Sequence, residues 1–230
     1  MYKRVIFSVL CCASGVQYID SVMREMLERE LLESQQPSLM VRHLLAQGQL
    51  NVSMPELVAL VGVPQHAPWH PEGDAFEHTM QVLDAVAMRA YESKRDRLTF
   101  LYAALCHDLG KAVTTKLEDG VWRAHEHEIV GVPIARTMLE RLGVDELMTA
   151  IVCKLTRHHM DPAQFIRHKE PPEMYQWLAR ELAGFVSLET LIEFSLCDLR
   201  GRGADGPLAD ETFPTIEAFR ARARKEGILR

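Results

Sequence analysis

The sequence predicts an all-α fold that carries one small β-hairpin flap. Apolar residues recur at helical spacing in most segments between Asp20 and Leu199, and glycine and proline separate these segments. A strong two-residue turn signal, Asp119-Gly120, stands between two short runs with strand character. The 230 residues are enough for one well-buried core, so we expect one compact unit.

The expected elements follow one another with short breaks. The Pro- and Gly-rich segment 64–74 must be loop, the hairpin covers Thr114–Ala124, and Asp161-Pro162 should close the helix that precedes it. We divide the chain into a helical N-terminal preface, residues 1–62, and a main domain, residues 63–230. The expected helices are Asp20–Leu32, Ser38–Ala46, Met54–Gly62, Ala75–Ala90, Asp96–Gly110, Glu126–Leu142, Asp145–His159, Met174–Leu182, Ser187–Leu199 and a weak terminal helix over Phe213–Arg230.

Composition narrows the class of protein. The net charge of −6 gives no general attraction to nucleic-acid backbones or anionic membranes. The five cysteines are odd in number and lack a C-x-x-C pair, which argues against a disulfide framework or a structural zinc site and favours the cytoplasm. Residues 1–15 have the outline of a short signal peptide, but their apolar run, Val5–Cys12, is far too short to span a bilayer. We therefore expect a cytoplasmic protein with no membrane partner.

The least ordinary feature is the pair His107-Asp108. It stands near the end of an apolar helical pattern, and Gly110 is where a left-handed C-cap would fall. Adjacent helical positions point about 100° apart, so an imidazole and a carboxylate there can flank a cation beside the helix end. The plain alternative is a buried histidine that is capped by its own aspartate.

Two further polar residues fall on core helices. His78 sits in the first turn of its helix, and Asp198 lies on the very apolar helix Ser187–Leu199. An aspartate in such surroundings costs several kcal/mol to desolvate unless it is paired or bound to a cation. We therefore predict that His78, His107, Asp108 and Asp198 share a divalent metal ion. Two imidazoles and two carboxylates suit Mn, Ni, Co, Fe, Mg or catalytic Zn.

The order His78, His107-Asp108, Asp198 resembles the HD superfamily of metal-dependent phosphohydrolases. The flanking residues are more closely similar to the C-terminal HD domain of bacterial CCA-adding enzymes, the tRNA nucleotidyltransferases, over about residues 20–219. The runs that carry this resemblance are Val63-Pro64-Gln65, Trp69-His70-Pro71-Glu72-Gly73-Asp74, His78-Thr79, Cys106-His107-Asp108-Leu109-Gly110-Lys111, His125-Glu126-His127-Glu128 and Asp198-Leu199-Arg200-Gly201-Arg202.

This resemblance implies an HD-domain helical bundle and an HD phosphohydrolase domain over residues 63–230. The nucleotidyltransferase head of those enzymes has no counterpart here, because residues 1–15 are too short to hold it, so we do not expect CCA addition. What the family then implies is hydrolysis of 2′,3′-cyclic phosphodiesters, 2′-nucleotides or general phosphate monoesters.

The residues are consistent with this chemistry on their own. A divalent ion would lower the pKa of a water molecule for in-line attack on phosphorus, and Asp108 could also orient that water. Lys111, Arg200 and Arg202 are expected to accept the charge that develops on the phosphoryl oxygens. The alternative for these cations is a solvated surface at helix ends.

The remaining histidines separate less clearly. We expect His127 and His158, ahead of their neighbours His125 and His159, to complete a second metal site or to contact substrate; the alternative is a structural or exposed role. His70 lies in the Pro-rich loop and is expected to touch substrate. Three others are expected on the surface: His43, His66 and His168.

The sequence thus predicts a metal-dependent phosphohydrolase that acts on a phosphomonoester or a 2′,3′-cyclic phosphodiester of a nucleotide. One alternative is a catalytically vestigial module that binds tRNA or protein; the acidic balance does not favour tRNA. The other is a nucleoside triphosphate or alarmone hydrolase, which would share the metal site. The pattern does not fix an oligomeric state.

Overall fold

The computed structural model describes residues 24–202 and 207–229 and confirms an all-α fold with one β-hairpin. A helix over residues 24–33 comes first among the described elements. The elements that follow are α2 (Ser38–Ala46), α3 (Leu50–Ser53), α4 (Pro55–Val58), α5 (Ala75–Ala87), α6 (Lys94–Cys106), α7 (Lys111–Thr114), β1 (Thr115–Glu118), β2 (Val121–Ala124), α8 (His127–Arg141), α9 (Glu146–His158), α10 (Asp161–Arg167), α11 (Pro172–Leu182), α12 (Leu188–Arg200) and α13 (Pro207–Lys225).

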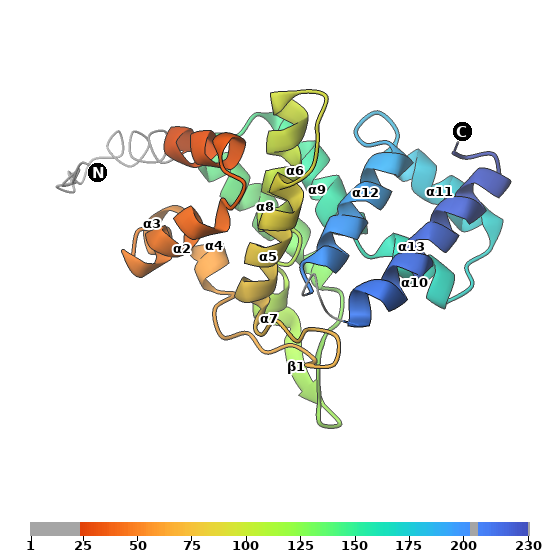
Figure 1. The fold of residues 1–230 in the computed structure, drawn as a ribbon, viewed down its shortest axis with the longest axis horizontal. Coiled ribbons are helices and arrows are strands. Elements are labelled where there is room, and N and C mark those ends of the chain that lie inside the picture. Colours follow the sequence, from red (N-terminus) through yellow and green to blue (C-terminus); the bar gives the residue numbers. More distant parts are fainter. Residues whose placement is uncertain (1–23, 203–206, 230) are drawn as a thin grey trace.

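The helices α5, α6, α8, α9 and α12 form the centre of the bundle (Figure 1). Helix α6 packs against both α5 and α9, while α9 pairs with α8 and α12 packs on α5. The short helices α2 to α4 lie on one side of this centre, and α10, α11 and α13 lie on the other. Side chains at the inner ends of the central helices are therefore enclosed by other helices from several directions.

The hairpin projects from one end of the molecule, next to α7 (Figure 1). Its strands pair in antiparallel register from Thr115 opposite Ala124 to Glu118 opposite Val121. Asp119 and Gly120 both have positive φ, at 50° and 77°, as a tight Asp-Gly turn requires. The predicted flap is thus confirmed, with one residue fewer at its start.

Side-chain caps set the starts of the central helices. Asp74 accepts a hydrogen bond from the backbone N–H of Glu77 at the start of α5, and Ser93, Asp145 and Ser187 cap α6, α9 and α12 in the same way. Each such cap stabilises its helix by about 1 kcal/mol. The other carboxylate oxygen of Asp74 accepts from the backbone N–H of Gly62 at 2.6 Å, which ties down both ends of the loop 63–73.

One apolar cluster runs through the described part of the chain. Leu27, Leu44 and Leu57 from the N-terminal helices belong to it together with residues of α5, α6 and α12 such as Leu101 and Phe194. The division between residues 1–62 and 63–230 stays a prediction. Within the described residues, none of the helices combines the length and the apolar character that crossing a bilayer needs.

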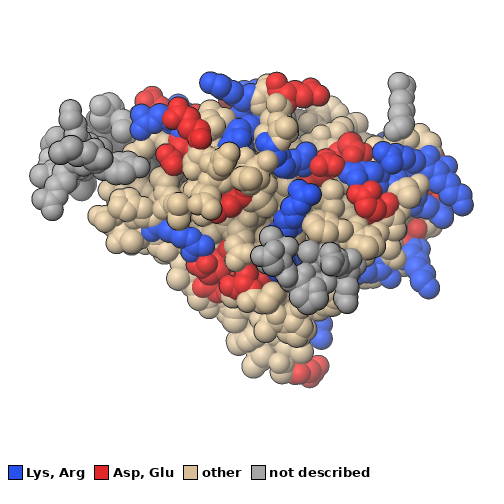
Figure 2. Space-filling model, in the orientation of Figure 1, with Lys and Arg blue, Asp and Glu red and all other residues tan. Residues whose placement is uncertain are grey.

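The surface charge is mixed over most of the face in Figure 2. Lysine and arginine side chains gather at the end of the molecule where α13 finishes, and the last turn of that helix carries Arg222, Arg224 and Lys225. Elsewhere on this face, acidic and basic side chains alternate. Apart from the end where α13 finishes, this face offers no broad basic area for a nucleic-acid backbone.

Two short helices were not predicted, although the helix before Asp161-Pro162 ends where it was expected to. Asp161-Pro162 does not merely end a helix; it starts α10, where Pro162 stands in the first turn and its missing N–H costs nothing. A second unexpected element is the short helix α3, Leu50–Ser53, which carries buried Leu50. In both places a short run of residues gave too little periodicity to reveal a helix.

Gly110 is also different from the expectation. Its φ is −64°, so it is not a left-handed cap, and α6 already ends at Cys106. A Cβ atom at Gly110 would lie 2.1 Å from the carbonyl oxygen of His127 and 2.8 Å from the backbone nitrogen of Gly131. Glycine is therefore needed because the main chain of α8 passes directly against the turn that carries His107 and Asp108.

We expect Gly110→Ala to destabilise the fold by more than about 2 kcal/mol, because backbone atoms on the facing helix cannot move aside. The comparison variant is Gly62→Ala, where φ is +77° and nothing lies within 4 Å of the added Cβ, so that only about 1 kcal/mol of backbone strain is introduced. Urea unfolding of both variants measures the difference. Equal losses would contradict the close approach as the reason for glycine.

Candidate active site

The four side chains predicted to share a metal ion converge at the centre of the bundle. His78 comes from the first turn of α5, His107 and Asp108 from the turn after α6, and Asp198 from the last turns of α12. All of them are buried, and the most exposed, Asp198, retains 5% of its accessible surface.

The contacts within this group are short. His78 Nε2 lies 2.9 Å from Asp198 Oδ1 and 3.6 Å from Asp108 Oδ2. His107 Nε2 lies 3.2 Å from Asp108 Oδ2 and 3.8 Å from Asp198 Oδ1. Two imidazole nitrogens and two carboxylates therefore face one small volume.

The other carboxylate oxygen of Asp108 faces a second pair of histidines. His127 Nε2 lies 3.2 Å from Asp108 Oδ1, and His159 Nε2 lies 3.9 Å from the same oxygen. The two imidazole nitrogens are 3.4 Å apart. Asp108 thus stands between two groups of candidate ligands, one at each of its oxygens.

The hydrogen bonds of these histidines fix which nitrogen carries the proton. Nδ1 of His107, His127 and His159 lies 2.8 Å from the backbone oxygen of the residue three positions earlier. A carbonyl oxygen can only accept, so each Nδ1 is protonated and donates. The lone pair of each neutral ring is consequently on Nε2, the nitrogen that faces Asp108.

His78 follows the same rule with a different partner. Its Nδ1 lies 2.8 Å from Glu72 Oε1 and 3.3 Å from the backbone oxygen of Gly201, and both of these atoms are acceptors. Nε2 therefore presents its lone pair to Asp198 unless a second proton or a metal ion lies between them. Burial lowers the pKa of His78, but hydrogen bonds with Asp198 and Glu72 outweigh it and raise the pKa overall.

The polar atoms at the centre need a cation. Among the described residues, His107 Nε2 and both carboxylate oxygens of Asp108 have no hydrogen-bond partner, although Lys111 Nζ lies 2.6 Å from Asp108 Oδ2. Burial raises the pKa of Asp108, but the charges of His107 and Lys111 hold it well below its usual range. Burial and the nearby His107 and His127 lower the pKa of His159 to about 3. Carboxylate oxygens and imidazole nitrogens at these distances fit a divalent ion.

The position of His159 was missed by the sequence reasoning, which favoured its neighbour His158. The structure turns His158 the other way: its Nδ1 lies 2.8 Å from Asp161 Oδ2, and its ring packs edge-on against Trp177. Consecutive residues at a helix end point about 100° apart, so only one of them can face Asp108. The sequence pair His158-His159 indicated a candidate metal ligand. The sequence pattern did not show which of the two side chains the rotation of α9 turns toward Asp108.

Of the three cations that the sequence predicted at the site, two lie beside the candidate ligands and one does not. Lys111 is buried beside Asp108, and its Nζ also donates to Gln65 Oε1 at 2.8 Å. Arg202 reaches within 3.6 Å of Asp198 Oδ2. Arg200 is exposed and its guanidinium lies over the ring of Phe213, so the structure does not bring it to the other site residues.

A pocket of about 220 Å³ opens from Asp108 and Asp198 to the surface. One wall is the loop before α5, with Gln65, Trp69 and His70; the hairpin supplies Trp122 and Arg123. Lys111, Arg167 and Arg202 also line it. The candidate ligands therefore sit at the bottom of a pocket that a small anionic molecule can enter.

The remaining histidines lie in varied places. His66, which was expected on the surface, is half-buried and lines the pocket, while His43 and His168 are exposed as expected. His125 is exposed and pairs with Glu118 of the hairpin.

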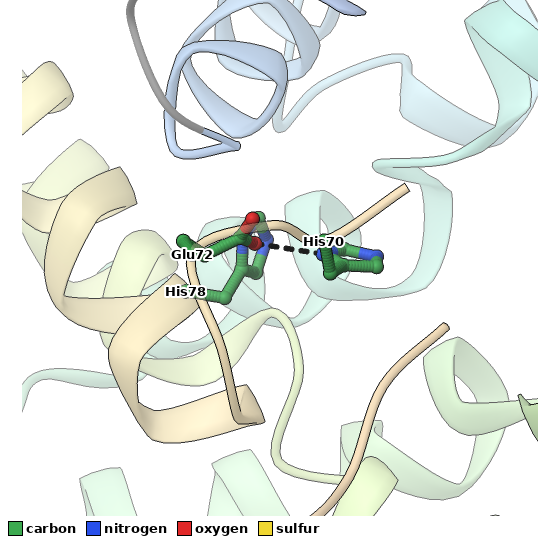
Figure 3. A group of neighbouring side chains, drawn as sticks. All are labelled: His70, Glu72 and His78. Atoms are coloured by element: carbon green, nitrogen blue, oxygen red, sulfur yellow. Dashed lines mark hydrogen bonds and ion pairs between the residues drawn. The ribbon is translucent and has the colours of Figure 1, made fainter. Parts of the chain in front are cut away.

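Glu72 connects two histidines next to the site (Figure 3). Its Oε1 lies 2.8 Å from Nδ1 of His78 and 2.8 Å from Nδ1 of His70, and its side chain has no exposed surface. Burial raises the pKa of Glu72, but these two hydrogen bonds lower it to about 2, so it is a carboxylate at neutral pH. Burial lowers the pKa of His70 to about 3. Its neutral ring therefore donates from Nδ1 to Glu72, and Nε2 points away from that carboxylate (Figure 3).

Comparison with known protein sequences identifies a family over part of the chain. Residues 75–182 match the family model of the HD domain, so this part of the chain is an HD domain. The HD domain defines a superfamily of metal-dependent phosphohydrolases, and the resemblance inferred from the sequence is confirmed.

The curated relatives are more specific. The chain is similar to the Multifunctional CCA proteins of Pasteurella multocida (40% identity over 76% of this chain and 41% of the relative), Halorhodospira halophila (33%, over 88% and 49%) and Xanthomonas campestris pv. campestris strain B100 (34%, over 89% and 50%). It spans half or less of the length of each of these three relatives.

We expect Glu72→Ala to weaken Mn²⁺ binding by about 10- to 100-fold, because His78 then loses the partner that fixes its tautomer and orientation. Glu72→Gln keeps one acceptor oxygen and should lose less. Titration of metal-stripped protein with Mn²⁺, followed by calorimetry, measures this affinity without any assay of activity.

The matched control is Glu77→Ala, one residue before His78, where the carboxylate pairs with Arg42 on the outer side of the helix. It should bind Mn²⁺ as the unaltered protein does. If Glu72→Ala and Glu77→Ala had the same affinity, Glu72 would have no part in positioning His78.

Proposed function

We propose that this protein is a metal-dependent phosphohydrolase that cleaves a phosphomonoester or a 2′,3′-cyclic phosphodiester of a nucleotide. The observation that carries the proposal is the convergence of the Nε2 atoms of four imidazole rings on Asp108 and Asp198 at the bottom of a pocket lined by cations. Buried carboxylates in such surroundings would only cost stability in a purely structural core.

The candidate ligands fall into two sets. His78, His107, Asp108 and Asp198 would hold one divalent ion, and Asp108, His127 and His159 would hold a second. A bound ion supplies Lewis acidity and lowers the pKa of a coordinated water molecule. The choice between Mn, Ni, Co, Fe, Mg and Zn is open to experiment, since a mixed nitrogen and oxygen site accommodates all of them.

The residues of the pocket wall would bind and orient the phosphate. Lys111 beside Asp108 and Arg202 beside Asp198 present positive charge next to both candidate metal positions. Negative charge that builds on the phosphoryl oxygens is stabilised by such fixed cations in a partly desolvated site. We assign to Arg202 the role that the sequence suggested for Arg200, because Arg200 lies outside the pocket wall.

Two other functions are less well supported. A vestigial module that binds tRNA or protein would not need the buried set of candidate ligands. The name of the relatives, Multifunctional CCA protein, does not assign an activity to this part of their chains. A nucleoside triphosphate or alarmone hydrolase would use the same ligands and differ in the pocket wall. For the compartment we propose the cytoplasm, in keeping with the free, buried thiols of Cys106, Cys153 and Cys197.

Exhaustive chelation should abolish hydrolysis, and Mn²⁺, Co²⁺ or Ni²⁺ should restore it. Asp108→Asn should lower kcat by on the order of a thousandfold or more, since Asp108 contacts both ligand sets. The measurement is hydrolysis of 2′,3′-cyclic AMP, 2′-AMP and 5′-AMP, together with elemental analysis of the protein. Full activity of the chelated protein, or of Asp108→Asn, would refute the metal-centred mechanism.

The neighbouring histidines provide a matched pair of variants. We expect His159→Ala to reduce kcat by about 10- to 100-fold, because it removes a nitrogen that faces Asp108. His158→Ala should instead cost about 2 kcal/mol of stability through the lost contact with Asp161 while leaving kcat of the folded protein nearly unchanged. Steady-state kinetics and thermal unfolding of both variants test this. The reverse assignment would hold if His158→Ala were the inactive variant.

A further inference from the structure

Arg167, the last residue of α10, is a cation of the pocket that neither the sequence pattern nor the proposed chemistry uses. Its guanidinium lies 5.4 Å from the ring centre of Trp69, which comes from the loop before α5. Both residues line the pocket that leads to Asp108 and Asp198. Two segments far apart in the sequence are thus joined at this wall.

The four cations of the pocket differ in their partners, and Arg123 of the hairpin lies 3.9 Å from Glu118. Lys111 lies 2.6 Å from Asp108, and Arg202 lies 3.6 Å from Asp198. Arg167 has no carboxylate within ion-pair distance among the residues that the structure describes. Burial, followed by the repulsion from Arg202, lowers the pKa of Arg167. Arg167 is exposed at the pocket wall, so an incoming anion can reach its guanidinium and pair with it.

The cation–π contact with Trp69 leaves the hydrogen-bond donors of Arg167 unoccupied among the described residues. The planar guanidinium can therefore bind two oxygens of a phosphate while it keeps this contact. The contact also restricts the side chain before an anion binds, so that less entropy is lost on binding.

Arg167 lies nearer the surface than the candidate metal ligands at the bottom of the pocket. Asp108 retains 1% of its accessible surface, whereas Trp69 retains 42%. The phosphorus that reacts must lie at the buried end, next to the candidate ligands, and Trp69 and Arg167 stand nearer the mouth. A phosphate next to Asp108 and a group bound at Trp69 and Arg167 would therefore lie at different depths of the pocket.

We propose that Arg167 and Trp69 form a subsite for a second phosphate of the substrate, so that the preferred ligand is a nucleotide with a phosphate besides the one that reacts. This proposal rests on the proposed function, since it assumes that the first phosphate binds at Asp108. A nucleoside with phosphates on both the 3′ and 5′ sides of its ribose fits this description, as does the phosphorylated end of an oligonucleotide.

The test compares two product-like probes, adenosine 3′,5′-bisphosphate and adenosine 3′-monophosphate, by calorimetry with the protein as purified. The unaltered protein should bind the bisphosphate at least about tenfold more tightly, as expected for a charge-assisted contact to a phosphate. Arg167→Ala should remove this preference while binding the monophosphate normally. Arg167→Lys keeps the charge but lacks the planar pair of donors, so it should retain only part of the preference.

Arg180→Ala is the matched control, because Arg180 is an exposed arginine on α11 and does not line the pocket. It should keep the full preference for the bisphosphate. Thermal unfolding of each variant shows that the comparison concerns folded protein, and Arg167→Lys serves if Arg167→Ala does not fold.

Two results would overturn the subsite. One is equal affinity of the unaltered protein for the two probes; the other is an equal loss for both probes in Arg167→Ala, which would mark a general effect of charge. Failure of the proposed function is separate, since it consists in the absence of metal-dependent hydrolysis of any phosphoester. A preference for the bisphosphate would stand even then as a property of the binding pocket.

Discussion

The two buried carboxylates Asp108 and Asp198 impose the constraint on which the rest of the structure depends. Each is anionic and nearly inaccessible to water, and each faces the Nε2 atoms of imidazole rings. Two buried carboxylates so close together are unfavourable unless cations are present, so the fold has to hold them against their mutual repulsion. The bundle does so by bringing the ends of α5, α6, α8, α9 and α12 to one point, with each helix contributing a side chain or the turn beside it.

Three of the histidines at the site are oriented by the same kind of hydrogen bond. His107, His127 and His159 donate from Nδ1 to a backbone oxygen three residues earlier. This bond satisfies a carbonyl that the end of a helix or strand leaves free, and it also turns Nε2 inward. Main-chain hydrogen bonding and ligand geometry are therefore satisfied together. His78 uses Glu72 from the preceding loop instead.

Sequence patterns identified the elements and the ligands that lie on long, strongly periodic helices. His78 and Asp198 could be placed because the apolar residues around them fix the inward face of α5 and α12. The patterns could not choose between His158 and His159, or between Arg200 and Arg202, because that choice depends on the rotation of the last helical turn. Arg167 gave no signal at all, since its role depends on Trp69, which is distant in the sequence and lies in a loop.

The contact between Gly110 and Gly131 has a consequence for ion selection. Asp108 lies two residues before the first glycine, and His127 four residues before the second, so the gap between these two side chains is set by touching main chains and not by deformable side chains. Substitutions elsewhere in the core can then change packing without altering that gap. This backbone contact therefore limits the space for an ion between Asp108 and His127. An ion too large for that space would have to separate α8 from the turn after α6, whereas an ion that fits it needs no movement.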